Sequence, residues 1–393
     1  MFKVLKYAKD KWYIIVFIIL MLFVEVYCEL TLPGYTSNIV DVGIKNQGVE
    51  YPVPERMTAD TYKGLSDVLM DEDKELLASF YTHRAGGYTL NIDRTDEEKM
   101  ETLEKLLLPA EMMLMTPKKL SGVDKINDYP EYMLEAAGIE FVKNEYKRLG
   151  VDMDKYQMDY LKLTAVKMFG IAMLALLVSI IVGYLSSRLA AGTARDLRKK
   201  IYFKVMGFSN AEINNFSTSS LITRCTNDVG QVQMVLTMVF RIVVFAPIMG
   251  VGAVIKVMGS AVSMAWTVVV AVAAVMILII VLMVVAMPKF QIMQKLIDEL
   301  NLVSREILTG LPVIRAFGRE RHEEKRFEEA SRALMKTQLF TSGTMALMLP
   351  TMMFIMNGIS VLIIWVGAGK INTGDLQVGE MMAFLTYAMN IVM

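Results

Sequence analysis

Apolar residues in this chain are gathered into six long runs, and polar segments separate them. An α-helix needs roughly 20 apolar residues to cross the hydrocarbon layer of a membrane. Every run approaches or meets that length, and the last one ends with the sequence. The pattern therefore predicts an all-α membrane protein with six membrane-spanning helices. The runs are Trp12–Pro33, Met168–Ser187, Val235–Met258, Ala261–Met287, Phe340–Val366 and Met381–Met393.

The first apolar run has the basic flank of a signal peptide but not its other features. Lys3, Lys6, Lys9 and Lys11 precede it, as in a basic n-region. The run is too long for a signal peptide, however, and it ends in Pro33 and Gly34 rather than at a small-residue cleavage site. We expect it to be retained as a membrane anchor.

Charge is distributed unevenly along the 393 residues, although the formal net charge is zero. Residues 50–160 carry 24 acidic and 14 basic residues, which leaves 17 acidic and 27 basic residues elsewhere. Bases near span ends favour the cytoplasmic side of a membrane. With six crossings, the amino terminus is predicted to be cytoplasmic and residues 46–163 extracytoplasmic, in a multi-pass protein of the cell membrane.

The segment of residues 46–163 is predicted to form a small, mainly helical domain. Thr95-Asp96-Glu97-Glu98 has the spacing of a capping box, so a helix is expected to begin there and run towards Pro109. Tyr132–Leu149 is amphipathic and is followed by Gly150. Cys28 and Cys225 lie far apart in the chain, so no disulfide framework is expected. This domain could bind a substrate, a partner or the cell envelope, or it could simply cover the outer mouth of the membrane part.

Two polar segments, Arg188–Met234 and Pro288–Leu339, are predicted to form helical hairpins in the cytoplasm. In the first, helical composition continues to Met206, breaks at Gly207, and resumes after a short segment. In the second, Gly310-Leu311-Pro312 is expected to interrupt the helix, because glycine and proline are poor residues for a helix interior. The chain is accordingly divided into residues 1–45, 46–163 and 164–393.

Four motifs in this order resemble the membrane half of exporter-type (type IV) ABC transporters. The resemblance covers nearly all of the chain outside residues 46–160, and members of that family usually have a short loop where this chain has the extra domain. The motifs are Leu32-Pro33 with Ile39–Ile44, Ser220–Val229, Glu306–Glu320, and Gly374-Asp375-Leu376 with Ala383–Tyr387.

The resemblance implies a transmembrane subunit that moves an amphipathic or hydrophobic substrate, such as a drug, lipid or peptide, out of the cell by alternating access. ATP would close two nucleotide-binding domains, and the hairpin tips at 210–216 and 308–317 would follow them. A second six-span half, identical or different, would complete the pathway among membrane lipids. The residues expected to couple to the nucleotide-binding domains are Asn210, Glu212, Phe216, Ile307, Leu308 and Val313.

No Gly-x-x-x-x-Gly-Lys-Ser/Thr loop occurs in the sequence, so no catalytic or cofactor-binding residue is assigned to it. ATP and magnesium are expected on a nucleotide-binding domain outside these residues. The sequence stops at Met393 within an apolar run, and we interpret this as a truncated sequence rather than one half of a split transporter, because a chain end in mid-bilayer would leave backbone carbonyls unsatisfied.

Charged residues inside the predicted spans are candidates for a substrate pathway, because ionisable groups are costly in a membrane. Glu25 and Glu29 lie one turn apart in the first span and could attract a cation. Alternatively they lie at the outer interface, or pair with Arg241 or Lys256 of the third span.

Other classes of function fit less well. A membrane sensor or receptor with an extracytoplasmic ligand-binding domain would need a signalling module and would not need the paired hairpins. A proton- or sodium-driven carrier would be expected to show repeated halves. His83, His322 and the two cysteines offer no metal site, and the basic residues cluster at span ends rather than on a nucleic-acid-binding face.

Overall fold

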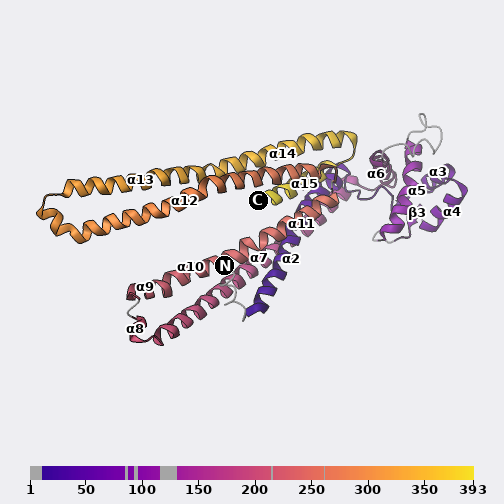
Figure 1. Cartoon of the computed structure of the whole chain (residues 1–393). Coiled ribbons are helices and arrows are strands. Elements are labelled where there is room, and N and C mark those ends of the chain that lie inside the picture. The colour runs from indigo at the N-terminus through magenta and orange to yellow at the C-terminus, as the bar shows by residue number, and fades with distance from the viewer. Residues whose placement is uncertain (1–10, 85–86, 93–95, 116–130, 214–215, 261) are drawn as a thin grey trace. The chain divides into compact units, whose positions relative to one another are not determined.

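The computed structural model describes residues 11–84, 87–92, 96–115, 131–213, 216–260 and 262–393. The chain divides into two compact units, which are considered separately (Figure 1). The first unit holds the residues up to Val262 together with Gly367–Asn390, and the second holds Ser263–Val366 with the last three residues.

The first unit contains the first three long helical segments, a small inserted domain and most of the last helix. Helix α2 packs against both α7 and α11. The buried residues at this contact include Ile18 and Leu22 of α2, Val178 and Val182 of α7, and Phe240. Outside the inserted domain, the elements of this unit are α2 (Trp12–Asn38), η2 (Ile39–Lys45), α7 (Met153–Met206), α8 (Asn210–Ile213), α9 (Thr218–Thr223), η4 (Arg224–Asp228), α10 (Val229–Met238), η5 (Val239–Val243), α11 (Phe245–Ser260), η6 (Val262–Met264, which runs into the second unit) and α15 (Val378–Val392, whose end belongs to the second unit).

Among the described residues, five helical segments are long and apolar enough to cross a membrane. They contain the first five predicted spans, except that the fourth begins at Ala265 rather than at Ala261. The last predicted span corresponds to α15, a shorter apolar helix. Together with the family assignment given below, these helices make the chain a multi-pass membrane protein of the all-α class, as the hydrophobic pattern predicted. The second unit comprises α12 (Ala265–Ala316), α13 (Glu320–Ala346) and α14 (Met348–Thr373, whose end belongs to the first unit).

The inserted domain, residues 46–152, combines four helices, counted over its described residues, with a three-stranded antiparallel sheet of order β1-β3-β2. The sequence analysis predicted the helical part but not the sheet. The domain has its own core, which includes Met57, Leu65, Leu103 and Leu107. Its elements are β1 (Arg56–Met57), α3 (Ala59–Val68), α4 (Asp71–Phe80), β2 (Tyr81–Arg84), β3 (Gly87–Leu90), α5 (Glu97–Met115) and α6 (Glu131–Arg148).

Both helices predicted in this domain are present, with one difference. Helix α5 begins at Glu97, the third residue of the predicted capping box, whose first residue, Thr95, lies outside the described residues. It does not end at Pro109 but continues to Met115. Helix α6 ends at Arg148, and Gly150 follows with a φ of +76°, as the glycine predicted.

Two buried carboxylates of the inserted domain have opposite surroundings. Glu145 on α6 accepts a hydrogen bond from the backbone N–H of Thr58 at 2.6 Å and another from the hydroxyl of Thr61 at 2.7 Å, so it fastens the beginning of α3. Glu111 on α5 is fully buried, and neither carboxyl oxygen has a hydrogen-bond partner. Burial raises the pKa of Glu111 well above its ordinary value, and the nearby charge of Glu104 adds to this shift.

The second unit is built on the hairpin of α12 and α13, which run side by side (Figure 1). The predicted interruption at Gly310 and Pro312 is wrong, because α12 continues through both residues to Ala316. The turn lies instead at Phe317-Gly318-Arg319. Proline removes one backbone hydrogen-bond donor from a helix, but the hydrogen bonds of the neighbouring turns can keep the helix intact. Gly318 has a φ of +55°, a left-handed conformation that ends the helix.

Candidate functional site

The tip of the first hairpin is a single turn of helix held by its own side chains. The backbone N–H and hydroxyl of Ser209 both donate to a carboxylate oxygen of Glu212, at 2.9 and 3.0 Å, and the N–H of Glu212 faces the Ser209 hydroxyl at 3.4 Å. This reciprocal pair caps α8, which includes Asn210. The hydrogen bond from the backbone of Ser209 is the main cause that lowers the pKa of Glu212. Glu212 therefore shapes the tip.

Phe216, which follows this turn, is partly covered by its neighbours. Its ring stacks on that of Phe208, with 5.8 Å between centroids, and the guanidinium of Arg224 lies 5.3 Å from the centroid of Phe216. Ile213, on α8, is a large apolar side chain that the described part of this tip exposes. The sequence analysis did not single out Ile213, although it is a large apolar residue in the short segment 211–215. Residues 214 and 215 lie outside the described part of the chain.

The tip of the second hairpin is closed by a Schellman motif. The N–H of Arg319 donates to the carbonyl of Ile314 at 3.0 Å, and the N–H of Gly318 donates to the carbonyl of Arg315 at 3.3 Å. This arrangement leaves Phe317 projecting at the turn, with 76% of its surface exposed. An exposed phenylalanine at the end of a long polar hairpin marks a candidate contact surface, because aromatic residues are enriched at protein–protein interfaces.

The three residues predicted for this tip lie on α12 rather than in the turn. Ile307 is half-buried, while Leu308 and Val313 are exposed. At 1.5 Å per residue, Leu308 is about 13 Å along the helix from Phe317. Leu308 has 74% of its surface exposed. The candidate contact surface on this hairpin therefore extends along the last turns of α12 and includes Phe317, which the predicted set omitted.

In each hairpin, a side-chain hydrogen bond joins the two antiparallel arms behind the tip. In the first, the guanidinium of Arg198 on α7 donates to the carbonyl of Cys225 at 3.3 Å. In the second, Arg326 on α13 donates to Glu306 on α12 at 2.6 Å. Each of these hydrogen bonds joins the two arms of its hairpin.

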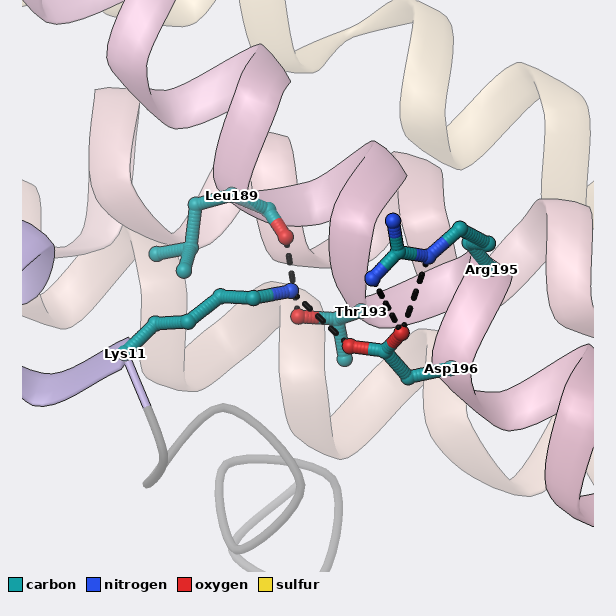
Figure 2. A network of polar contacts seen from close by, with 5 residues as sticks. All are labelled: Lys11, Leu189, Thr193, Arg195 and Asp196. Carbon is teal, nitrogen blue, oxygen red and sulfur yellow. Dashed lines mark hydrogen bonds and ion pairs between the residues drawn. The ribbon is translucent and has the colours of Figure 1, made fainter.

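A polar network joins the beginning of α2 to α7 (Figure 2). The ammonium of Lys11 lies 2.9 Å from one carboxylate oxygen of Asp196, and the guanidinium of Arg195 donates to the other oxygen at 2.8 and 3.0 Å. The Thr193 hydroxyl donates to the Leu189 carbonyl at 2.8 Å in the preceding turn. The network fixes the start of the first span against the second helical segment.

The predicted substrate-pathway residues do not form an ion-paired cluster within the described chain. Glu25 is buried, Glu29 is half-buried, and Arg241 is exposed on η5. No ion pair joins either glutamate to Arg241 among the residues that the structure describes. Lys256, the other predicted partner, lines an apolar groove with Tyr27 and Leu30 of α2. The assignment of these residues to a pathway stays a prediction.

Comparison with known proteins matches these helices to a family. Residues 141–393, which contain both hairpins, match the family described as the ABC transporter transmembrane region. An uncharacterized ABC transporter ATP-binding protein of Mycobacterium tuberculosis (strain ATCC 25618 / H37Rv) is 38% identical over 226 residues, which cover 58% of this chain and 39% of that protein.

Two further relatives have similar coverage. An uncharacterized ABC transporter ATP-binding protein of Bacillus subtilis (strain 168) is 30% identical over 57% of this chain and 39% of its own length. An ATP-dependent lipid A-core flippase of Pseudomonas fluorescens (strain Pf0-1) is 27% identical over 52% of this chain and 34% of its own length. The matched segment thus spans about two fifths of the first relatives' length.

Proposed function

Because this chain belongs to the ABC transporter transmembrane region family, we propose that it is the membrane-spanning part of an ATP-driven exporter. Nucleotide-binding domains would bind ATP and magnesium and would move the hairpin tips. The relatives named as ATP-binding proteins extend well beyond the matched segment, which supports such a domain in the complete transporter. A second six-span half, identical or different, would complete the pathway.

The observation that carries this proposal is the tip of the α12–α13 hairpin. It combines an exposed Phe317 and an exposed Leu308 with two helices that the Arg326–Glu306 ion pair joins. An aromatic anchor surrounded by polar groups is the usual centre of a protein–protein contact. The capped α8 turn with Ile213 would provide the corresponding contact of the first hairpin.

The proposed cargo is an amphipathic or hydrophobic molecule, of which drugs, lipids and peptides are the classes considered. The relative named as a lipid A-core flippase supports the lipid class. Alternating access would move the cargo outward. The uneven charge of the sequence supports a location of the inserted domain on the side opposite the hairpin tips, in the cell membrane.

A coupling experiment tests the proposal. The complete transporter is placed in lipid vesicles, and ATP hydrolysis and uptake of a fluorescent lipid are measured for Phe317→Ala and Leu308→Ala. We expect each variant to lower transport per ATP hydrolysed by at least fivefold, because the anchor at the tip is lost. Met335→Ala, which removes an exposed apolar side chain elsewhere on α13, is the control and should behave as the wild type.

The orientation needs a separate measurement. In a variant without Cys28 and Cys225, single cysteines replace Lys63 in the inserted domain or Phe317 at the tip. A membrane-impermeant maleimide added to intact cells should label the cysteine at 63, and it should label the one at 317 only after permeabilisation. Labelling of both in intact cells would contradict the proposed topology, and unchanged coupling in the Phe317 and Leu308 variants would contradict the proposed coupling surface.

A further inference from the structure

One face of the small sheet in the inserted domain carries two arginines on its two outer strands. In the antiparallel register, Arg56 of β1 lies opposite Thr89 of β3, which in turn lies opposite Thr82 of β2. Arg84 lies opposite Gly87, two residues further along the same strands. Side chains two positions apart share a face of a sheet, so Arg56 and Arg84 are on the same face. Met57 and Tyr88 are on the other face.

The spacing of these arginines suits one shared ligand. Neighbouring strands lie about 4.8 Å apart and residues rise about 3.4 Å along an antiparallel strand, so two strands and two residues place the Cα atoms of Arg56 and Arg84 about 12 Å apart. Two side chains as long as arginine can converge on one anion from that distance. A guanidinium binds phosphate or carboxylate with two parallel hydrogen bonds.

A cleft of about 610 Å³ is lined by Arg56, Arg84 and Thr89 of this face, together with other residues of the same strands. Its opposite wall comes from the end of α6 and the start of α7 and is largely apolar. Tyr146 and Tyr156 meet edge to face there, with 5.6 Å between ring centroids, and the Tyr146 hydroxyl accepts a hydrogen bond from the backbone N–H of Glu55 at 3.2 Å. The cleft is lined by Glu55, Arg56, Met57, Arg84, Gly87, Tyr88, Thr89, Tyr146, Leu149, Val151 and Tyr156.

The charge of the cleft is opposite to that of its surroundings. Residues 50–160 carry ten more acidic than basic residues. Even so, neither Arg56 nor Arg84 forms an ion pair within the described residues, and both side chains are exposed. The lining contains two guanidinium groups and the carboxylate of Glu55. Two positive groups without ion-pair partners among the described residues thus lie beside an apolar wall, and small-molecule sites combine an apolar lining with a few polar groups in this way.

We propose that this cleft binds a small anionic amphiphile. Arg56 and Arg84 hold its phosphate or carboxylate head, and Leu149, Val151 and Tyr156 contact its apolar or aromatic body. The volume is in the range of ordinary small-molecule sites. The proposal gives the inserted domain a recognition role of its own, and it does not depend on ATP-driven export.

Binding is measured by titration calorimetry on the full chain in nanodiscs of zwitterionic lipid, without ATP. Phenyl phosphate is the main probe, and inorganic phosphate and phenol supply its head and its body alone. We expect phenyl phosphate to bind at least tenfold more tightly than either part. Dihexanoyl phosphatidic acid is added as a separate probe: if it competes with phenyl phosphate, the natural head group belongs to a lipid, and if only phenyl phosphate binds, it belongs to a soluble molecule.

The variant Arg56→Ala/Arg84→Ala should weaken phenyl phosphate binding at least tenfold. The matched control is Lys63→Gln/Lys147→Gln, which removes two exposed positive charges from α3 and α6 of the same domain and should leave binding unchanged. Hydrogen exchange of α5 and α6 verifies that each variant keeps the fold. Equal binding by the double arginine variant, equal losses in both variants, or inorganic phosphate binding as tightly as phenyl phosphate would overturn the proposal.

Discussion

Asp41 accepts a hydrogen bond from the backbone N–H of Gly379 at 2.8 Å, although 338 positions separate the two residues. The N–H of Glu380 lies 3.1 Å from the other carboxylate oxygen, to which the hydroxyl of Ser37 also donates at 3.2 Å. Asp41 is 5% exposed. The carboxylate of the first span's extension η2 therefore caps the beginning of α15, where a negative charge is favourable.

Removal of this cap is expected to destabilise the membrane part. Asp41→Ala leaves the buried N–H groups of Gly379 and Glu380 without their acceptor, at a cost of about 1–3 kcal/mol in the free energy of unfolding. Thermal unfolding in detergent measures this effect. Asp375→Asn, an exposed acid in the adjoining turn, is the control and should change the melting temperature much less. Equal melting temperatures for Asp41→Ala and the wild type would disprove the capping role.

The close approach of Gly379 to η2 gives a second prediction. A Cβ atom at Gly379 would collide with a carboxylate oxygen of Asp41 and would lie 2.5 Å from the backbone carbonyl oxygen of Ser37. Gly379→Ala should therefore destabilise the protein by about 1–3 kcal/mol through overpacking. Gly369→Ala is the matched control, because a Cβ atom there meets nothing within 4 Å. In a helix interior that change should be neutral or stabilising, and the difference in melting temperature between the two variants measures the effect.

Glu111 should make the stability of the inserted domain depend on pH. Because its pKa in the folded protein is raised above the ordinary value of 4.5, the folded state holds more protons than the unfolded state above that pH. The contribution of Glu111 to the free energy of unfolding is therefore fully present below about pH 4.5, and it is lost as the pH rises from there towards the raised pKa.

Glu111→Leu removes the buried carboxyl and should abolish this fall. Hydrogen exchange of α5 and α6 amides, followed from pH 5 to pH 8 and corrected for the intrinsic exchange rate, measures the protection of the domain. Glu101→Gln, a change at an exposed acid on the same helix, should keep the wild-type pH dependence. If protection in the wild type does not decrease with pH, the carboxyl is not buried as described.

Replacement by alanine should affect stability differently at Gly252 and Gly192, two glycines close to the beginning or the side of α2. At Gly252, a Cβ atom would lie 2.7 Å from a methyl carbon of Leu30 and 3.3 Å from one of Val26, in the packed contact of α11 with α2. At Gly192, it would lie 2.7 Å from the ammonium nitrogen of Lys11, which a flexible side chain can move.

We expect Gly252→Ala to cost about 1–3 kcal/mol, as overpacking of helices does. We expect Gly192→Ala to cost less than 1 kcal/mol, because the partly exposed Lys11–Asp196 pair can shift into water. Thermal unfolding of the two variants compares them directly. The opposite order would show that the ion pair, rather than the apolar packing, holds α2 in place.

The helical framework could be predicted from the sequence because membrane-length apolar runs leave few alternatives. The residues at which the helices end were harder to predict. Gly207 ends α7 as predicted, whereas Gly310 and Pro312 do not end α12. A glycine ends a helix when the chain beyond it turns, as at Gly318 with its positive φ, and composition alone does not show which glycine will adopt that conformation.

The small sheet was missed because its strands are two and four residues long. Tyr88 and Leu90 do alternate with polar neighbours, and this weak period-two signal was outweighed by the helical segments around it. The pairing of Asp41 with Gly379 and the cleft at Arg56 and Arg84 depend on contacts between distant segments, which one sequence does not reveal. Among the coupling residues, the sequence singled out Leu308 and Val313, which the structure shows exposed on α12, but not Phe317 at the turn.

Because α12 is uninterrupted, its number of residues determines both its length and the direction in which the side chains at its C-terminal end point. The helix has 52 residues, and each residue advances the axis by about 1.5 Å and rotates the side chains by about 100°. Deleting a single residue between Pro288 and Leu308 would shorten the helix only slightly, yet it would swing Leu308, Val313 and Phe317 more than a quarter of the way around the axis. The number of residues in this segment therefore determines which side of the helix presents Leu308 and Val313.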